Sequence, residues 1–191
     1  MNGLSVRDVA VARQVAGLVL QYPDDVLLGD VPMLRAAVAG LPAPLRGPLG
    51  GLIDHVARTP DDVLTAEYVA TFDLTRRHAL HLTYFTHGDT RKRGLALLRI
   101  KQTYRRFGFV LDDTELPDHL SVVLEFAATV DAGAGTRLLL EHRAGLELLG
   151  LALADAGSPY AAATTAVSAT LPPLHGTVPV SYTHLTLPTK A

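Results

Sequence analysis

The sequence predicts an all-α fold, a single-domain helical bundle of about seven to nine helices. Alanine and leucine dominate the composition, and both residues lose little conformational freedom on entering a helix. Apolar residues recur at helical spacing between residues that start or stop helices, whereas the alternation typical of strands is almost absent. A chain of 191 residues can bury a substantial core in one domain.

The N-terminal segment predicts the first helix. Ser5, with Asp8 three residues further on, is a capping pair, and it predicts a helix that runs to about Leu20. Tyr22-Pro23 should end this helix, because the residue before a proline disfavours the helical conformation.

Three more helices are expected before residue 73. Pro32 should bound a short helix around Met33–Ala39, and a longer helix, weakened by internal glycines, should run from about Pro44 to Arg58. Thr59 and Pro60 then predict the start of a fourth helix, with a capping hydroxyl followed by proline at the first helical position. One face of that helix should carry Leu64, Tyr68 and Phe72.

The middle of the chain is less regular. Residues 73–90 lack a clear period and are expected to form a helix or an ordered loop rather than a strand. From Lys92 to Phe107 an apolar stripe predicts a helix that Gly108 stops. Pro117 should open the next helix, whose apolar face is formed by Leu120, Val123, Leu124 and Ala127.

Two further helices are predicted towards the C-terminus. Gly133 and Gly135 should break the preceding helix, and Thr136 should cap a long helix. The apolar face of this long helix should carry Leu139, Leu146, Leu149 and Leu153. Gly157-Ser158-Pro159 combines a stop signal with a start signal and predicts a last helix to about Thr170.

Residues 180–191 do not follow the helical pattern. They are polar and β-branched, and they resemble the translation of a sequencing adapter, so an adapter-derived or disordered tail is expected there. The helical domain is accordingly expected to cover residues 1–179 and to be truncated at its C-terminal end.

Composition narrows the class of protein. The net charge of −2 offers no global attraction to nucleic acid or to anionic membranes. Cysteine is absent, which agrees with a reducing cytoplasm, and no signal peptide is recognised at the N-terminus. No stretch approaches the roughly 20 apolar residues that a membrane span needs. A cytoplasmic protein without direct membrane insertion is therefore expected.

Three histidines, His78, His81 and His87, form the first group that could carry chemistry. His78 and His81 would share one face of a helix and could both reach a metal ion. No glutamate partners them in the arrangement typical of zinc hydrolases, and His87 lies beyond an expected break. Packed polar histidines are the simpler interpretation, so neither a metal nor a cofactor is predicted. A metal-dependent hydrolase using this group remains an alternative.

Basic residues fill the segment Arg91–Arg106, and no acid lies between Asp89 and Asp112. Tyr104 and Phe107 interleave with them, as in nucleic-acid binders, but both aromatic residues fall on the apolar stripe. A solvated helix face is the simplest interpretation. Contacts with an anionic partner are expected through Arg91, Arg93 and Arg99, and a nucleic-acid-binding adaptor is the second alternative.

The third group is Glu115, Pro117, Asp118 and His119 at the start of a predicted helix. Acids near a helix N-terminus are stabilised by the helix dipole, which explains Glu115 and Asp118. A cation is disfavoured there, so His119 is expected to be neutral and able to hydrogen-bond a partner. An Asp-His pair without a nucleophile at recognisable spacing is poor evidence for catalysis, and no enzyme is predicted.

Four ordered blocks resemble the NarJ family, the delta-subunit chaperones of respiratory nitrate reductase. The blocks are Tyr68-Val-Ala-Thr-Phe-Asp73, His81-Leu-Thr-Tyr-Phe85, Gly88-Asp-Thr-Arg-Lys-Arg-Gly94, and Glu115-Leu-Pro-Asp-His-Leu120 with Leu124-Glu-Phe126. The similarity extends from about residue 5 to Leu174, and four motifs in order are far more specific than any one of them.

The resemblance implies a helical chaperone of the redox-enzyme maturation class. Such proteins bind the N-terminal peptide of the molybdoenzyme catalytic subunit and hold the apoenzyme open for insertion of the molybdenum cofactor. They leave the finished enzyme. Proteins that deliver the cofactor are possible further partners, and nucleic acid is not expected as a partner. In related chaperones the Pro-Asp-His segment belongs to the peptide-binding region, which maps here to Pro117, Asp118 and His119.

A helical partner peptide in an apolar groove would use anchors at helical spacing. The expected groove has an apolar wall made of Tyr68, Phe72, Tyr84 and Phe85. Asp118 and His119 are expected to fix the polar end of the peptide.

Overall fold

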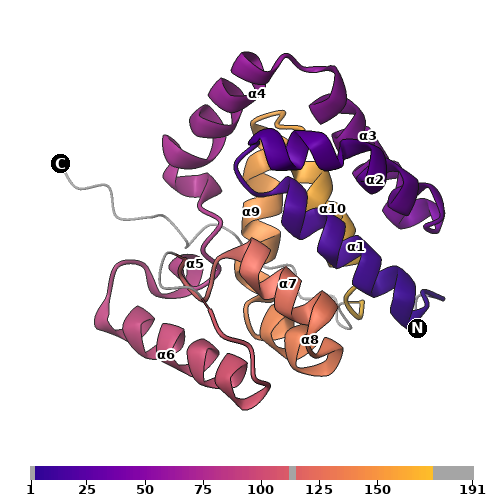
Figure 1. The fold of residues 1–191 in the computed structure, drawn as a ribbon. Coiled ribbons are helices and arrows are strands. Elements are labelled where there is room, and N and C mark those ends of the chain that lie inside the picture. The colour runs from indigo at the N-terminus through magenta and orange to yellow at the C-terminus, as the bar shows by residue number, and fades with distance from the viewer. Residues whose placement is uncertain (1–2, 112–114, 174–191) are drawn as a thin grey trace.

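The computed structural model describes residues 3–111 and 115–173, and in these ranges it is helical with no strand (Figure 1). The described ranges contain ten α-helices, which confirms the all-α fold and slightly exceeds the expected number. Their bounds are α1 Val6–Val19, α2 Asp25–Ala39, α3 Ala43–Arg58, α4 Asp61–Tyr68, α5 Tyr84–His87, α6 Arg91–Arg106, α7 Leu120–Thr129, α8 Ala132–Glu141, α9 Arg143–Asp155 and α10 Ala161–Ala169.

The core lies where α1, α3, α7, α9 and α10 meet. Helix α1 packs along α7, while α10 packs against α3, α9 and α1. Helix α2 covers α3, and α8 follows α7 as its antiparallel neighbour in Figure 1. Helix α6 lies at the edge of the molecule, and only Ile100 and Tyr104 of its side chains are buried (Figure 1).

Helix α1 begins as the sequence predicts. The Ser5 hydroxyl accepts a hydrogen bond from the Asp8 amide, and the Asp8 carboxylate accepts one from the Ser5 amide. This reciprocal pair satisfies two backbone donors that the first turn of a helix leaves without partners. The helix ends at Val19 with Leu20 as its cap.

Helix α2 is longer than expected, because it begins at Asp25 and contains Pro32. The Asp24 carboxylate caps it by accepting hydrogen bonds from the amides of Val26 and Leu27. The boundary expected at Pro32 is therefore wrong. A proline inside a helix removes one backbone hydrogen bond. Burial of apolar side chains on both sides of the proline compensates for this loss, and these are Leu27, Val31, Leu34 and Val38.

The fourth helix buries the predicted apolar face, but its N-terminal cap is not the predicted residue. Thr59 is not the cap, since its hydroxyl donates to the carbonyl oxygen of His55, and Pro60 occupies the capping position. Helix α4 continues into a π-helix over Val69–Asp73, and Leu64, Tyr68 and Phe72 are all buried. Extra residues in a helical turn of this kind often occur at functional sites.

Residues 73–90 form an ordered connection, as expected. They comprise a 3₁₀-helix over Arg76–His78, the short helix α5, and a single antiparallel bridge between His81 and His119. Gly145 of α9 lets this segment approach closely, because a Cβ atom at that position would lie 2.9 Å from the carbonyl oxygen of Leu82.

The observed boundaries of α7 to α9 differ from the predicted ones in three places. Helix α7 starts at Leu120, so Pro117 precedes the helix instead of opening it. The break after α7 falls at Val130, and Asp131, not Thr136, caps the next helix. The predicted long helix is split in two at His142. The predicted apolar faces are confirmed, because all eight residues assigned to them are buried.

Gly135 lies inside α8, not at a break, and it allows α8 to contact α7. A Cβ atom on Gly135 would lie 2.2 Å from the Cβ of Ala127 and 2.3 Å from its Cα, which is backbone and cannot swing away. The predicted tail at residues 180–191 and the boundary at residue 179 lie outside the described residues. No helix of the described part of the chain is long and apolar enough to cross a membrane.

Replacement of Gly135 by alanine should separate α7 from α8. The added methyl group overlaps backbone atoms of Ala127, so the free energy of unfolding should fall by about 2–4 kcal/mol. Gly133→Ala on the same helix is the matched control, because its Cβ meets side-chain atoms only at 3.4 Å or more. This control should be neutral or stabilising by up to ~1 kcal/mol. Urea unfolding of both variants measures the difference, and equal stabilities would contradict the close packing.

Candidate functional site

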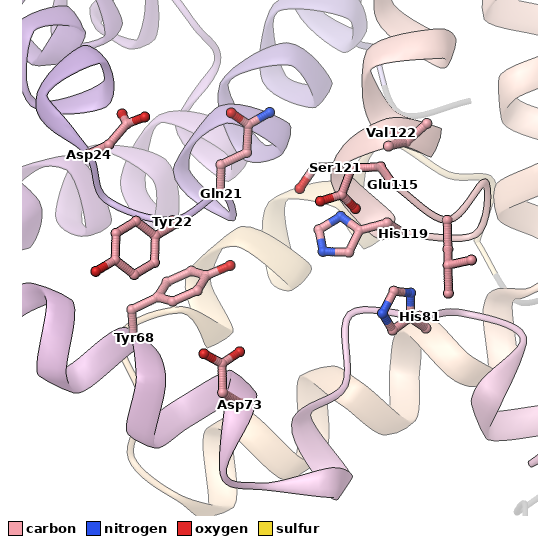
Figure 2. A pocket seen from close by; sticks show the side chains of 11 residues that line it. Gln21, Tyr22, Asp24, Tyr68, Asp73, His81, Glu115, His119, Ser121 and Val122 are labelled. Atoms are coloured by element: carbon pink, nitrogen blue, oxygen red, sulfur yellow. The ribbon is translucent and has the colours of Figure 1, made fainter. Parts of the chain in front are cut away.

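A cavity of about 730 Å³ opens where the end of α1, the π-helix, and the start of α7 come together (Figure 2). It is lined by Gln21, Tyr22, Asp24, Tyr68, Asp73, His81, Glu115, Leu116, His119, Ser121 and Val122. Figure 2 shows His81 and His119 on one side and the ring pair Tyr22 and Tyr68 on the other. The walls therefore come from segments up to 101 residues apart, from Gln21 to Val122.

Two backbone hydrogen bonds hold the histidine side of the cavity. The Leu82 amide donates to the Asp118 carbonyl oxygen at 3.0 Å, and the Leu120 amide donates to the Leu80 carbonyl oxygen at 2.8 Å. The Tyr104 hydroxyl of α6 donates to the carbonyl oxygen of Pro117 at 2.8 Å. The Pro117-Asp118-His119 segment is therefore fixed from two directions before α7 begins.

The Asp118 side chain is completely buried beneath this segment, with 0% exposure. Its carboxylate accepts hydrogen bonds from the amide and the hydroxyl of Thr83. His81 Nδ1 lies 3.4 Å from one carboxylate oxygen, and Arg93 Nη2 lies 3.6 Å from the other. Burial by itself would raise the pKa of Asp118, but the contacts of His81 and Thr83 and the charge of Arg93 lower it below its ordinary value.

Asp118 was expected to contact the partner peptide, but its side chain has no exposed surface in the folded chain. Thr83, His81 and Arg93 surround this carboxylate, although its Oδ1 atom makes no hydrogen bond to the described residues. The carboxylate holds Thr83 and lies beside His81. Pro117 is buried as well, so His119 is the one member of the Pro-Asp-His segment that reaches the cavity.

His119 lies at the capping position of α7, and its ring contacts the ring of His81 edge to face, with centroids 5.2 Å apart. Burial, reinforced by the neighbouring His81, lowers the pKa of His119 to about 4, although Asp118 acts in the opposite direction. His119 is therefore neutral at pH 7, as the sequence predicts, and presents an uncharged imidazole to the cavity.

The aromatic side of the cavity is centred on Tyr68. The Tyr68 hydroxyl donates to the carbonyl oxygen of Leu20 at 3.0 Å, which attaches α4 to the end of α1. The Tyr68 ring packs edge to face on Tyr22, with centroids 5.6 Å apart, and lies 4.8 Å from the ring of Phe72. Burial, with Asp73 and Glu115 adding to it, raises the pKa of Tyr68.

The apolar residues expected to form one wall fall into two groups. Tyr68 lines the cavity, whereas Phe72 is buried behind it against Tyr160, with ring centroids 4.9 Å apart. Tyr84 and Phe85 lie on α5 and do not line this cavity. Sequence spacing could not separate the groups, because the contacts that divide them come from α9 and α10.

The basic residues of α6 also differ in their surroundings. Arg91 and Arg99 are exposed, but the Arg93 guanidinium lies between buried Asp118 and exposed Asp89, over the ring of Tyr84 at 5.9 Å. Arg93 therefore lies beside a buried carboxylate, and its expected contact with an anionic partner stays a prediction.

The histidine group does not form the arrangement that the metal-dependent hydrolase alternative required. His78 lies in the 3₁₀-helix, where its ring nitrogens contact the carbonyl oxygens of Thr71 and Ala152 at 2.9 and 3.2 Å. His81 faces Asp118 instead, so the two histidines do not share a helix face. No group of acids, histidines or cysteines in the described ranges could hold a metal ion.

Several cavity residues were not assigned to a site from the sequence. Asp73 and Glu115 lie within recognised motifs, but their approach to one cavity depends on the fold. Tyr22 carried a weak signal as an aromatic residue directly before a helix-ending proline, and the structure shows it half exposed. Gln21, Asp24, Leu116, Ser121 and Val122 carried none.

Comparison with known proteins gives the family. Residues 39–166 match the family model described as nitrate reductase delta subunit. The nitrate reductase-like protein NarX of Mycobacterium tuberculosis is 43% identical over 160 residues, which cover 84% of this chain but only 24% of that protein. The chain thus spans about a quarter of the length of NarX.

Named chaperones are also similar. The probable nitrate reductase molybdenum cofactor assembly chaperone NarJ of Bacillus subtilis is 29% identical, and the match covers 83% of this chain and 86% of that protein. The NarJ chaperone of Escherichia coli is 31% identical over 77% of this chain and 64% of its own. These relatives are named for assembly and not for catalysis, in agreement with the prediction that the chain is not an enzyme.

A solved structure supports the fold. The crystal structure of a putative redox enzyme maturation protein from Archaeoglobus fulgidus matches with a TM-score of 0.61 at 22% identity, covering 83% of this chain and 91% of that one. The family model extends over most of the helical core, from the end of α2 to α10. This chain therefore belongs to the nitrate reductase delta subunit family, which includes the NarJ assembly chaperones.

Proposed function

We propose that this chain is a chaperone that binds the N-terminal region of a respiratory nitrate reductase catalytic subunit. It holds the apoenzyme competent for insertion of the molybdenum cofactor and is absent from the finished enzyme. The family membership supports the general role, and the cavity at the start of α7 is the observation that carries the binding step.

The cavity suits a peptide better than a reactive small molecule. It combines half-exposed apolar side chains, Tyr22 and Leu116, with backbone-fixed polar groups, and none of its described residues forms a nucleophile–base pair. Its volume of about 730 Å³ can hold a few side chains of a docked segment. Tyr68 and His119 lie on opposite sides and would contact such a segment from both (Figure 2).

The buried Asp118 contributes indirectly to this binding. One of its oxygens contacts Thr83 and Arg93 and the other lies beside His81, so the loop that bears His81 keeps its place beside His119. Tyr84 and Phe85 follow directly on α5 and would extend the apolar contact beyond the cavity. Exposed Arg91 and Arg99 of α6 would contact an anionic partner, and proteins that deliver the cofactor are candidates for it.

Calorimetry with a synthetic N-terminal peptide of a nitrate reductase catalytic subunit tests the binding step. Tyr22→Ala and Leu116→Ala should each weaken binding by roughly tenfold, because each removes an apolar anchor of the cavity. Both side chains are 42–51% exposed, so the fold should tolerate their loss.

Leu151→Ala is the matched control for these two variants. Leu151 is 47% exposed on α9 and does not line the cavity, so the affinity should be unchanged. Absence of measurable binding by the unmodified chain would contradict the proposed function. Equal weakening by all three substitutions would remove the cavity from the binding site.

The stability of the chain should depend on pH through His119. In the folded chain the pKa of this imidazole is lowered to about 4, whereas an unfolded histidine binds a proton below about pH 6.5. Between these values the unfolded state holds more protons, so stability should fall as the pH falls. The total effect should be on the order of 2–3 kcal/mol.

His119→Asn removes this titration and keeps a hydrogen-bonding side chain that also caps helices well. Urea unfolding of both proteins at several pH values between 7 and 4 isolates the contribution, because every other group titrates in both. The unmodified chain should lose more stability than the variant as the pH is lowered. Parallel pH profiles would show that His119 is not held neutral by the fold.

A further inference from the structure

We propose that the cavity is a subsite for one cationic side chain of the bound peptide, with an arginine guanidinium held between Asp73 and Glu115. This inference rests on the proposed function for its partner and adds the chemical class of the group that the cavity selects. Four features of the cavity carry it.

The charge of the lining is the first feature. Among the described residues, three carboxylates line the cavity, and neither lysine nor arginine does so. Asp24 is already engaged as the cap of α2. Asp73 and Glu115 have no ion-pair partner within the described ranges, and Figure 2 shows their carboxylates extending towards the space between the aromatic and histidine sides. The cavity therefore has an excess of negative charge.

The second feature is Ser121, whose hydroxyl lacks a partner. Ser121 is 3% exposed, and its Oγ makes no hydrogen bond within the chain although it lines the cavity. Figure 2 shows the hydroxyl between Gln21 and His119 in that view. Buried hydroxyls are nearly always paired, because leaving one unpaired costs free energy. Here the missing partner is supplied when a donor enters the cavity.

The aromatic side supplies the third feature. The rings of Tyr22 and Tyr68 meet edge to face, which leaves ring surface beside Asp73 for a cation (Figure 2). Asp73 and Glu115 both act on the Tyr68 hydroxyl, where they add to the effect of burial in raising its pKa. Both carboxylates therefore act on the region around the Tyr68 hydroxyl, although one comes from the π-helix and the other from the segment before α7.

The histidines do not cancel this charge, which is the fourth feature. His119 is uncharged at pH 7, because burial lowers its pKa to about 4. His81 is directed to Asp118 at 3.4 Å, and Asp118 also has Arg93 as a neighbour. No cation among the described lining residues balances Asp73 and Glu115, and a bound partner would supply one.

A guanidinium fits this set better than an ammonium. The acceptors come from three directions, namely Asp73, Glu115 and Ser121, and a planar guanidinium carries five N–H donors that can address them together. Its flat face can also stack on a tyrosine ring. A lysine would satisfy fewer of these groups at once.

The first arm of the test uses a probe that does not depend on the peptide. Titration of the isotope-labelled chain with Nα-acetyl-arginine amide, followed by NMR, should shift the amide signals of Tyr68, Glu115 and Ser121. The citrulline analogue has nearly the same shape without the charge and should shift them much less. Equal responses to the two amides would overturn the subsite.

The second arm uses the catalytic-subunit peptide and calorimetry. An Asp73→Asn, Glu115→Gln double variant should bind the peptide roughly tenfold more weakly, and the difference should shrink in high salt. An Asp62→Asn, Asp155→Asn variant changes the net charge equally at exposed positions outside the cavity and should bind normally. Equal affinity of the cavity variant and the unmodified chain would overturn the inference and leave the proposed function standing.

Ser121→Ala separates a binding role from a structural one. Removing an unpaired buried hydroxyl should leave the free energy of unfolding unchanged or higher, while the affinity for the arginine amide falls severalfold. Unchanged affinity would exclude Ser121 from the subsite. If the peptide fails to bind at all, the proposed function is contradicted, and the amide titration alone decides whether the cavity binds cations.

Discussion

The carboxylate of Asp118 has no exposed surface, and the arrangement around the cavity depends on how its charge is satisfied. A buried ionised group is costly unless donors and opposite charges surround it. Thr83, His81 and Arg93 supply these from a loop and from α6, which otherwise buries only two side chains. One carboxylate thereby joins the start of α7 to the loop that bears His81 and to α6.

The cavity follows from this arrangement. With the His81 loop held beside His119, the polar side of the cavity is set, and the Tyr68–Leu20 hydrogen bond sets the aromatic side. The π-helix after α4 contributes as well, because it carries Asp73 next to the ring of Tyr68 while Phe72 stays in the core. The site thus combines a rigid polar scaffold with side chains that remain available to a partner.

Close helix packing supports the other side of α7. Gly135 brings α8 against Ala127, and Gly145 brings α9 against the carbonyl oxygen of Leu82. Both contacts act on elements that border the cavity, so their packing and the polar network reinforce each other. A preformed site loses little conformational entropy when a partner binds.

Much of the fold could be predicted from the sequence alone. The helical spacing of Leu120, Val123, Leu124 and Ala127 defined a buried face, and Ser5 with Asp8 defined a helix start, because both signals are local. The ordered motifs indicated the family for the same reason. Boundaries were less accurate where packing outweighed local preference, as at Pro32 and Gly135.

The candidate site was decided by the tertiary structure. The sequence singled out Asp118, Arg93 and Tyr68 but could not show that the first two neutralise each other in the interior. Nor could it show that Asp73 and Glu115, 42 residues apart, approach one cavity together with an unpaired Ser121. Burial and long-range pairing depend on how helices pack in three dimensions, whereas sequence periodicity reports only which face of each helix is turned inwards.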